Sequence, residues 1–335
     1  MADFTFETLE YTRPDIEGAI KRTQELTRAV ESAQSYAEVR AAMMENDRLS
    51  KHLSTLLSIC YIRHTINTKD EFYEAENRFI MVEHRLFDLK NRPGKASTGY
   101  MTDLPEYRAP FVFSCFNHTT FDAEVLTHEM GHAFAGYEAM RAQPISDYYS
   151  ESTDIAEIHS MSMEQFCYPY AERFFGADAD KYRYGHLQEA VTFVPFGVAV
   201  DEFQHICYAD PGLTPRERTL EWRKLEQKYM PWRTYDPEDE FMCRGGMWYH
   251  KPHIFLSPMY YINYTLTTVG AMEFKKKFAL DRAAAWSDYL ALCRIGGSKN
   301  YLSALETAHL SCPFTPGAVE NALSYAVDSL LSHAI

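Results

Sequence analysis

The sequence predicts a mainly α-helical protein with one small β-sheet beside a helix that carries two histidines. Apolar residues recur at three- and four-residue steps over long stretches, which is the period of an amphipathic helix. Residues 98–117 instead combine two short aromatic and β-branched runs around a turn, as a β-hairpin does. The motif HEMGH at residues 128–132 follows that segment closely and lies in a helical stretch.

The helical pattern begins at residues 15–47 and continues at residues 49–66 and 70–90. The letters NRPG at residues 91–94 then end it, because proline and glycine stop helices. The predicted hairpin, TGYMTDLPEYRAPFVFSCFN, turns at Asp-Leu-Pro-Glu. Beyond it, the predicted helices cover residues 122–140, 151–175, 178–208, 214–229, 257–280, 281–294 and 298–309.

Composition narrows the class of protein. The chain has 335 residues, 46% hydrophobic and 24% charged, and these suffice for a real core. A formal charge of −14 and a pI near 5.4 argue against nucleic acid or anionic membrane as a partner. No apolar stretch approaches the roughly 18 residues that span a bilayer, and the acidic first residues do not resemble a secretory signal. Seven cysteines without a C-x-x-C pair fit a reducing compartment. We therefore expect a cytoplasmic protein.

The HEMGH motif predicts a metal site. His128 and His132 are four residues apart, so on a helix both rings reach the same ion. Glu129 could hold and deprotonate a metal-bound water. A catalytic zinc usually takes three protein ligands and leaves one position open. Two glutamates compete for the third place: Glu151, at a spacing typical of zinc aminopeptidases, and Glu157, in an amphipathic stretch. Spacing alone leaves this choice open.

Several longer motifs resemble oligoendopeptidase F, in the thimet oligopeptidase family of zinc peptidases. They are HEMGHAF, DIAEIHSMSMEQF, KYRYGHLQEAVTFVPFGVAVDEFQH and HIFLSPMYYINYTL, and they occur in the family's order. The resemblance runs from about Met81 to the end and implies a zincin-type helical catalytic domain with a small β-sheet beside the HExxH helix. Residues 1–80 would then form an N-terminal helical segment, and residues 81–335 the zinc metallopeptidase catalytic domain.

The resemblance also implies roles for individual residues. His128, His132 and Glu157 would bind one Zn²⁺ per chain, with Glu129 as the general base. Glu164, two turns beyond Glu157, would either orient a ligand histidine or form a local ion pair within the helices. Both interpretations of Glu164 stay open at this point.

A tyrosine-rich segment supplies candidates for stabilising the oxyanion. In the family, a histidine followed by tyrosines covers the scissile bond, and His253 fits that histidine by position. If Pro258 opens a helix, Tyr261 and Tyr264 share one face, and Tyr260 and Tyr264 share another. We expect His253, Tyr261 and Tyr264 to act, with the choice among the three tyrosines left open. Gly245-Gly246 suggests a hinge for the segment.

These features together predict a zinc endopeptidase that cleaves short, flexible oligopeptides. The alternative is a degenerate relative that binds zinc and peptide without efficient turnover, although a protein that only binds has no need of Glu129. A purely structural zinc site is disfavoured, because such sites fill all four positions, usually with cysteine. The strand around residues 111–116 should offer an edge on which an extended peptide can pair.

The chain is shorter than full-length relatives. The resemblance implies that a large helical block of the family is missing between about Phe79 and Met81. Helices that pack on that block would expose apolar surface here, which could drive self-association.

Overall fold

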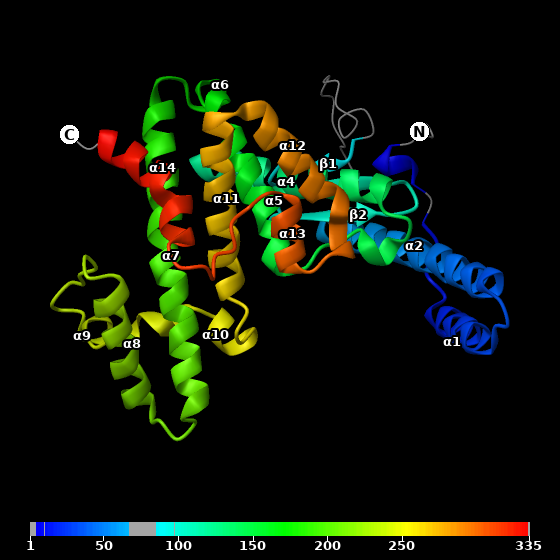
Figure 1. The fold of residues 1–335 in the computed structure, drawn as a ribbon, viewed down its shortest axis with the longest axis horizontal. Coiled ribbons are helices and arrows are strands. Elements are labelled where there is room, and N and C mark those ends of the chain that lie inside the picture. The colour runs from blue at the N-terminus through cyan, green and yellow to red at the C-terminus, as the bar shows by residue number, and fades with distance from the viewer. Residues whose placement is uncertain (1–4, 10, 67–84, 97, 334–335) are drawn as a thin grey trace. The chain divides into compact units, whose positions relative to one another are not determined.

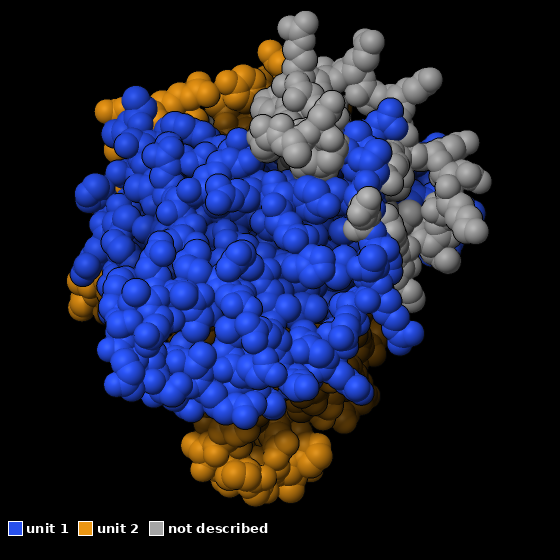
Figure 2. Space-filling model, turned by 90° about the vertical axis from the view of Figure 1, so that its right-hand side faces the viewer, with its two compact units in different colours: residues 1–152, 283–309 blue, residues 153–282, 310–335 orange. Residues whose placement is uncertain are grey.

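Helices make up most of the residues that the structure describes, as the sequence predicts, and the strands form one small sheet (Figure 1). The structure is a computed structural model that describes residues 5–9, 11–66, 85–96 and 98–333. Unit 1 comprises residues 1–152 and 283–309, and unit 2 comprises residues 153–282 and 310–335 (Figure 2). Across the described ranges, none of the helices has the length and apolarity that crossing a bilayer requires.

The sheet of unit 1 contains the predicted hairpin. Strands β2 (Tyr100–Leu104) and β3 (Ala109–Phe113) are antiparallel, and Leu104 faces Ala109 at the turn. Arg108 closes the turn with a left-handed φ of 47°. The strands begin and end within the expected segment, but β2 extends through Asp103 and Leu104, which the sequence pattern assigns to the turn.

A third strand replaces the end of a predicted helix. Strand β1 (Phe87–Asp88) pairs in parallel with β3, so the prediction of helix up to residue 90 is wrong over its last residues. A short apolar run does not distinguish helix from strand, and here pairing with β3 decides. Asp88 is fully buried and pairs with Lys95 at 3.0 Å and Arg92 at 2.6 Å. The rest of that predicted helix, and the junction between Phe79 and Met81, lie outside the described residues.

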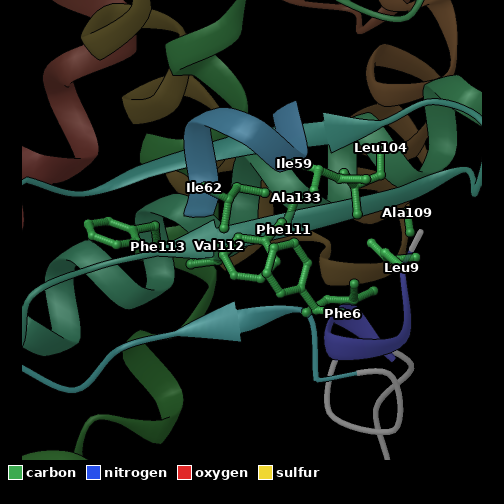
Figure 3. Packing of buried hydrophobic residues seen from close by; sticks show 11 residues of the cluster. Phe6, Leu9, Ile59, Ile62, Leu104, Ala109, Phe111, Val112, Phe113 and Ala133 are labelled. Carbon is green, nitrogen blue, oxygen red and sulfur yellow. The ribbon is translucent and has the colours of Figure 1, made fainter. Parts of the chain in front are cut away.

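Strand β3 is the central strand, in the order β1-β3-β2. Both of its edges are paired, so the expectation that this strand offers a free edge to a peptide is wrong. All five of its residues are buried. All of them except Pro110 pack with Phe6 and Leu9 near the N-terminus, Ile59 and Ile62 of helix α2 (Tyr36–Ile66), and Ala133 of helix α4 (Thr120–Ala142) (Figure 3).

The N-terminal helices divide at a different place from the predicted one. The structure has α1 (Ile16–Ser32) and α2 (Tyr36–Ile66), with the break at residues 33–35 rather than residue 48. Ser35 Oγ accepts from Glu38 N at 3.3 Å, and Glu38 Oε2 accepts from Gln34 N at 2.7 Å. These reciprocal bonds satisfy the backbone donors of a new helix start. Unit 1 also holds α4 (Thr120–Ala142), α13 (Tyr301–Thr307) and all of α12 (Arg282–Ile295) after its first residue.

Unit 2 is built around three long helices, α7 (Ala179–Ala209), α11 (Ile262–Leu280) and α14 (Ala318–His333), which lie side by side (Figure 1). The sequence pattern did not predict α14. The predicted helix 151–175 is split, because Pro169 follows α5 (Thr153–Phe166) in a short 3₁₀ turn, Tyr168–Tyr170. The other helices of this unit are α6 (Glu172–Phe175), α8 (Pro215–Tyr229), α9 (Glu240–Cys243) and α10 (His253–Leu256).

Helix α11 packs closely on two neighbours because glycines stand at the contacts. A Cβ atom on Gly197 of α7 would lie 1.9 Å from Thr265 Oγ1 of α11. A Cβ atom on Gly270 of α11 would lie 3.1 Å from the Ile158 side chain of α5. Gly197 is buried, so any larger side chain there must push the two helices apart.

We expect Gly197→Ala to lower the free energy of unfolding by roughly 1–3 kcal/mol, because the added methyl group overpacks this contact. Gly185, on the same helix, has no atom within 4 Å of an added Cβ. Gly185→Ala should instead raise stability by roughly 0.4–1 kcal/mol, through helix propensity alone. Denaturant titration of the two variants checks this, and equal shifts would contradict the packing argument.

Candidate metal centre and catalytic residues

The residues that the sequence singles out are divided between the two units. His128, Glu129 and His132 belong to unit 1, whereas Glu157, His253 and Tyr264 belong to unit 2. Each unit therefore fixes the local geometry of its own group of side chains.

Helix α4 presents the two histidines. Its start is held by Asp122, whose carboxylate accepts from the backbone N–H groups of Asn117 at 2.9 Å and His118 at 2.6 Å. From there the helical register brings the rings of His128 and His132 together, with centroids 5.0 Å apart and planes at 81°. Both side chains are half-buried. Two neighbouring imidazoles on one helix face are a donor set that suits zinc.

Glu129 lies on the buried side of the same helix turn. Its side chain is 8% exposed. Its Oε1 lies 3.5 Å from the position that a Cβ atom on Gly99 would take, just before β2. The missing side chain at Gly99 therefore leaves room for this carboxylate beside the sheet. Next to a histidine that bound a metal ion, a buried acid would be in the position from which a general base acts.

Asp103 of β2 is a further acidic residue near the histidines. Its Oδ1 is buried and accepts no hydrogen bond from the described residues. The pKa of Asp103 is raised to about 7, mainly by burial and also by the charge of Glu151, while His132 opposes the rise, so all three groups are close in space. A Cβ atom on Gly136 would lie 2.8 Å from Asp103 Oδ1. An oxygen without a partner beside His132 suits a carboxylate that orients a ligand histidine.

Sequence reasoning missed Asp103 because its Asp-Leu-Pro-Glu context is typical of a turn. The available signal was Gly136, one turn after His132, since a glycine inside a helix often marks a close approach. The acid that makes this approach cannot be identified without knowing which strand packs on the helix.

In unit 2, α5 carries Glu157 and α11 packs against it. Ser160, one turn further along, donates a hydrogen bond to Glu157 Oε2 at 2.9 Å. Ile158 packs against Gly270 of α11, which holds α5 in place. One carboxylate oxygen of Glu157 is thus oriented by a hydroxyl group, an arrangement that positions a metal ligand.

Glu164 forms a local interaction within unit 2. His186 Nε2 lies 2.7 Å from Glu164 Oε2, and His186 Nδ1 lies 2.6 Å from the hydroxyl of Tyr168. Both members of the pair have side chains that are 11% exposed. The interpretation of Glu164 as an acid paired inside the helices therefore has direct support.

The tyrosine segment forms a compact aromatic cluster. The ring of His253 lies 5.2 Å from that of Tyr261 and 6.0 Å from that of Tyr264, between centroids. Tyr260 and Tyr264 are 5.3 Å apart by the same measure. The expectation that Pro258 opens the helix is wrong, because α11 begins at Ile262 and Met259 has a left-handed φ of 62°. Tyr260 and Tyr261 therefore precede the helix.

The environments of the tyrosines differ. Tyr261 is 6% exposed and packs against Phe193 and Phe196, and burial raises its pKa to about 12. The pKa of Tyr264 is raised further, by burial, by its hydrogen bond with Tyr260 and by the negative charge of Glu157. Tyr264 therefore lies close enough to Glu157 for the charge of that carboxylate to contribute to its raised pKa.

His253 and the glycines before it complete the segment. His253 Nδ1 is buried and has no hydrogen-bond partner among the described residues. Gly245 needs its positive φ of 103°, and a Cβ atom there would lie 2.5 Å from Thr219 O. At Gly246 a Cβ atom would lie 2.4 Å from the Phe241 ring. Close packing therefore explains both glycines, and the structure gives no separate support to the expected hinge.

Comparisons with known proteins agree on one family. The family description Peptidase M3 N-terminal domain matches residues 6–85. The oligoendopeptidase F homolog of Borreliella burgdorferi is 22% identical over 67% of this chain and 38% of its own length. This chain therefore spans less than half the length of that curated relative.

Solved structures extend the agreement to the fold. PZ peptidase A with an inhibitor gives a TM-score of 0.84 at 26% identity, with 98% of this chain and 99% of that chain covered. A putative oligoendopeptidase F gives a TM-score of 0.68 at 36% identity, with 96% of this chain and 59% of that chain covered. In sequence and fold the chain is therefore similar to M3 peptidases and to proteins named oligoendopeptidase F.

Proposed function

We propose that this chain is a zinc-dependent endopeptidase that hydrolyses short, flexible oligopeptides. The observation that carries the proposal is the pairing of His128 and His132 on one face of α4, with Glu129 buried beside them. The similarity to known proteins supports the same activity, since those proteins are named as peptidases. All the residues concerned lie within residues 81–335, which we propose as the catalytic domain.

His128, His132 and Glu157 would hold the zinc ion. The three side chains supply two imidazoles and one carboxylate, the set that leaves one position open in hydrolytic zinc sites. Ser160 orients the Glu157 carboxylate, and the unpartnered Asp103 oxygen is available to orient His132. When bound, zinc would lower the pKa of water and polarise the peptide carbonyl.

Glu129 would act as the general base. Its carboxylate would take the proton from the attacking water and then deliver it to the leaving amine. Burial at 8% exposure keeps the group in place and limits its solvation. Because Glu129 is the residue next to His128, the base and the ligand move together with α4.

Tyr264 and His253 would stabilise the negative charge that develops on the carbonyl oxygen. The raised pKa of Tyr264 keeps its hydroxyl protonated at neutral pH, so the group remains a donor. Each such donor typically lowers the barrier by roughly 2.7–4 kcal/mol. Tyr261 remains a candidate, although its packing against Phe193 and Phe196 suits a role in holding the cluster together.

The second candidate function is zinc and peptide binding without efficient turnover. It is favoured by length, since the chain covers 59% of the oligoendopeptidase F structure and 38% of the curated relative. We propose a cytoplasmic location and no nucleic-acid or membrane partner, on the basis of the net charge of −14. Self-association through apolar surface remains part of the proposal.

Metal content and turnover separate the two functions. We expect about one zinc ion per chain, and cleavage of an internally quenched peptide that chelation abolishes and added zinc restores. Elemental analysis and fluorescence measure the two quantities on the same sample. Bound zinc with no cleavage of any peptide in a varied panel would favour the binding protein.

Glu129→Gln should retain the metal and lower turnover by about 10²-fold or more, because an amide cannot accept the proton. Glu138→Gln is the matched control on the same helix, since Glu138 pairs with Arg294 at 2.9 Å instead. That variant should keep both metal and activity. Near-parental turnover in Glu129→Gln would show that another group is the base.

Tyr264→Phe should lower kcat by about 10²-fold while changing KM little, the pattern of an interaction made in the transition state. The same substitution at Tyr260 and at Tyr261 identifies which hydroxyl acts. Steady-state kinetics on one peptide, with thermal unfolding of each variant, separates catalytic from structural effects. An unchanged kcat in Tyr264→Phe would remove this residue from the mechanism.

A further inference from the structure

Unit 2 contains a cavity of about 460 Å³ that no candidate metal or catalytic residue lines. Its walls come from the 3₁₀ turn after α5 and from α7, α11 and α14. Leu187, Phe278 and Leu330 provide apolar surface, and Tyr168, Tyr184 and Tyr325 provide aromatic surface. The volume suits a small organic molecule.

The cavity is electropositive although the chain as a whole is acidic. Lys275, Arg183 and Arg282 line it, and Asp180 is the single acid among its lining residues. Asp180 is already paired, since its carboxylate lies 2.7 Å from Arg183. In a chain of net charge −14, such a local excess of positive charge favours an anion.

Two of the three cationic side chains, Arg183 and Arg282, already interact with other groups of the protein. Arg183 also pairs with Glu172 and donates to the Tyr168 carbonyl at 3.0 Å. Arg282 donates to the hydroxyl of Tyr170 at 3.1 Å and lies 5.1 Å from the Phe278 ring centroid. Neither guanidinium is therefore free to serve as the main anchor of a ligand.

Lys275 lacks such a partner. Its ammonium group lies 3.6 Å from the centroid of the Tyr168 ring, and no carboxylate pairs with it in the described ranges. Burial, together with the positive charge of Arg183, lowers the pKa of Lys275 to about 7. A half-buried cation without a counter-charge is costly, and a bound anion would relieve that cost.

We propose that this cavity binds a small organic carboxylate with an apolar or aromatic body, whose carboxylate pairs with Lys275 Nζ. The single available ammonium suits one negative charge better than a phosphate dianion, which requires several donors. The aliphatic and aromatic walls suit the rest of such a molecule. This site is independent of the proposed peptidase reaction, because it shares no residue with it.

Binding should be linked to a proton. The carboxylate favours the charged form of Lys275, so the ligand draws a proton onto the amine near neutral pH. Affinity should be full below the free pKa of about 7 and should fall as the pH rises above it. The ionisable groups around the amine are Tyr168 of the 3₁₀ turn, Asp180, Arg183 and Tyr184 of α7, Arg282 after α11, and Tyr325 of α14.

Titration calorimetry of the full chain with phenylacetate tests the proposal, with phenylacetamide as the neutral isostere and inorganic phosphate as the second anion. We expect phenylacetate to bind about tenfold or more tightly than either alternative. Buffers of different ionisation enthalpy should reveal proton uptake at neutral pH.

Three variants complete the test. Lys275→Met should weaken phenylacetate binding about tenfold or more, whereas Lys275→Arg should bind it without the pH dependence, because arginine does not titrate in this range. Lys276→Met is the control on the same helix, since Lys276 Nζ bonds to Asn321 instead, and it should bind normally. Thermal unfolding confirms that each variant is folded.

Other outcomes overturn the proposal. These are absence of phenylacetate binding to the folded chain, equal affinity for phenylacetamide, or undiminished binding in folded Lys275→Met. Tighter binding of phosphate than of phenylacetate would overturn the assignment to carboxylates.

Discussion

The pairing of β3 on both of its edges is the constraint on which unit 1 depends. A strand that is hydrogen-bonded on both sides and buried along its length gives α4 a rigid surface to pack on. The face of α4 that packs inward is rich in small residues, including Ala133, Ala135 and Gly136. Because that face is fixed, the helical period determines where His128 and His132 point. The geometry of this histidine pair thus follows from a sheet of very few residues.

Residues of the same type in the sequence motifs differ in their electrostatic surroundings in the structure. Tyr261 and Tyr264 have the same chemistry in sequence, yet burial alone raises the pKa of Tyr261, whereas the charge of Glu157 also contributes to the raised pKa of Tyr264. Asp103 and Glu129 are both acids near the two histidines, but Asp103 lies on β2 and Glu129 lies on α4 itself. One adjoins Gly136 and the other adjoins Gly99, so a glycine makes room for each carboxylate. The missing side chain at each glycine leaves the space that the carboxylate occupies between the helix and the sheet.

The sequence predicts well those features that depend on local pattern. The hairpin, the HEMGH helix and the long helices α7 and α11 follow from periodicity and turn residues, whereas α14 was not predicted. Strand β1 could not be predicted, because two residues become a strand only by pairing with β3. Asp103 was missed for a related reason, since its role depends on packing between β2 and α4. The division of the chain into two units also depends on tertiary contacts. The sequence gives no sign of it, because no segment with the composition of a linker marks the boundaries.

The chain crosses between its units more than once, and this has a consequence for biosynthesis. Unit 1 is completed only by residues 283–309, which follow the whole central portion of unit 2. On a ribosome, the sheet and the histidine helix emerge early, but α12 and α13 reach them only after about 130 further residues have been made. Phe134 of α4, which packs against Trp286 and Tyr289 of α12, stays uncovered during that interval. A nascent chain that has not yet reached residue 283 would therefore expose this apolar flank of α4, and exposed apolar surface favours association with other chains during synthesis.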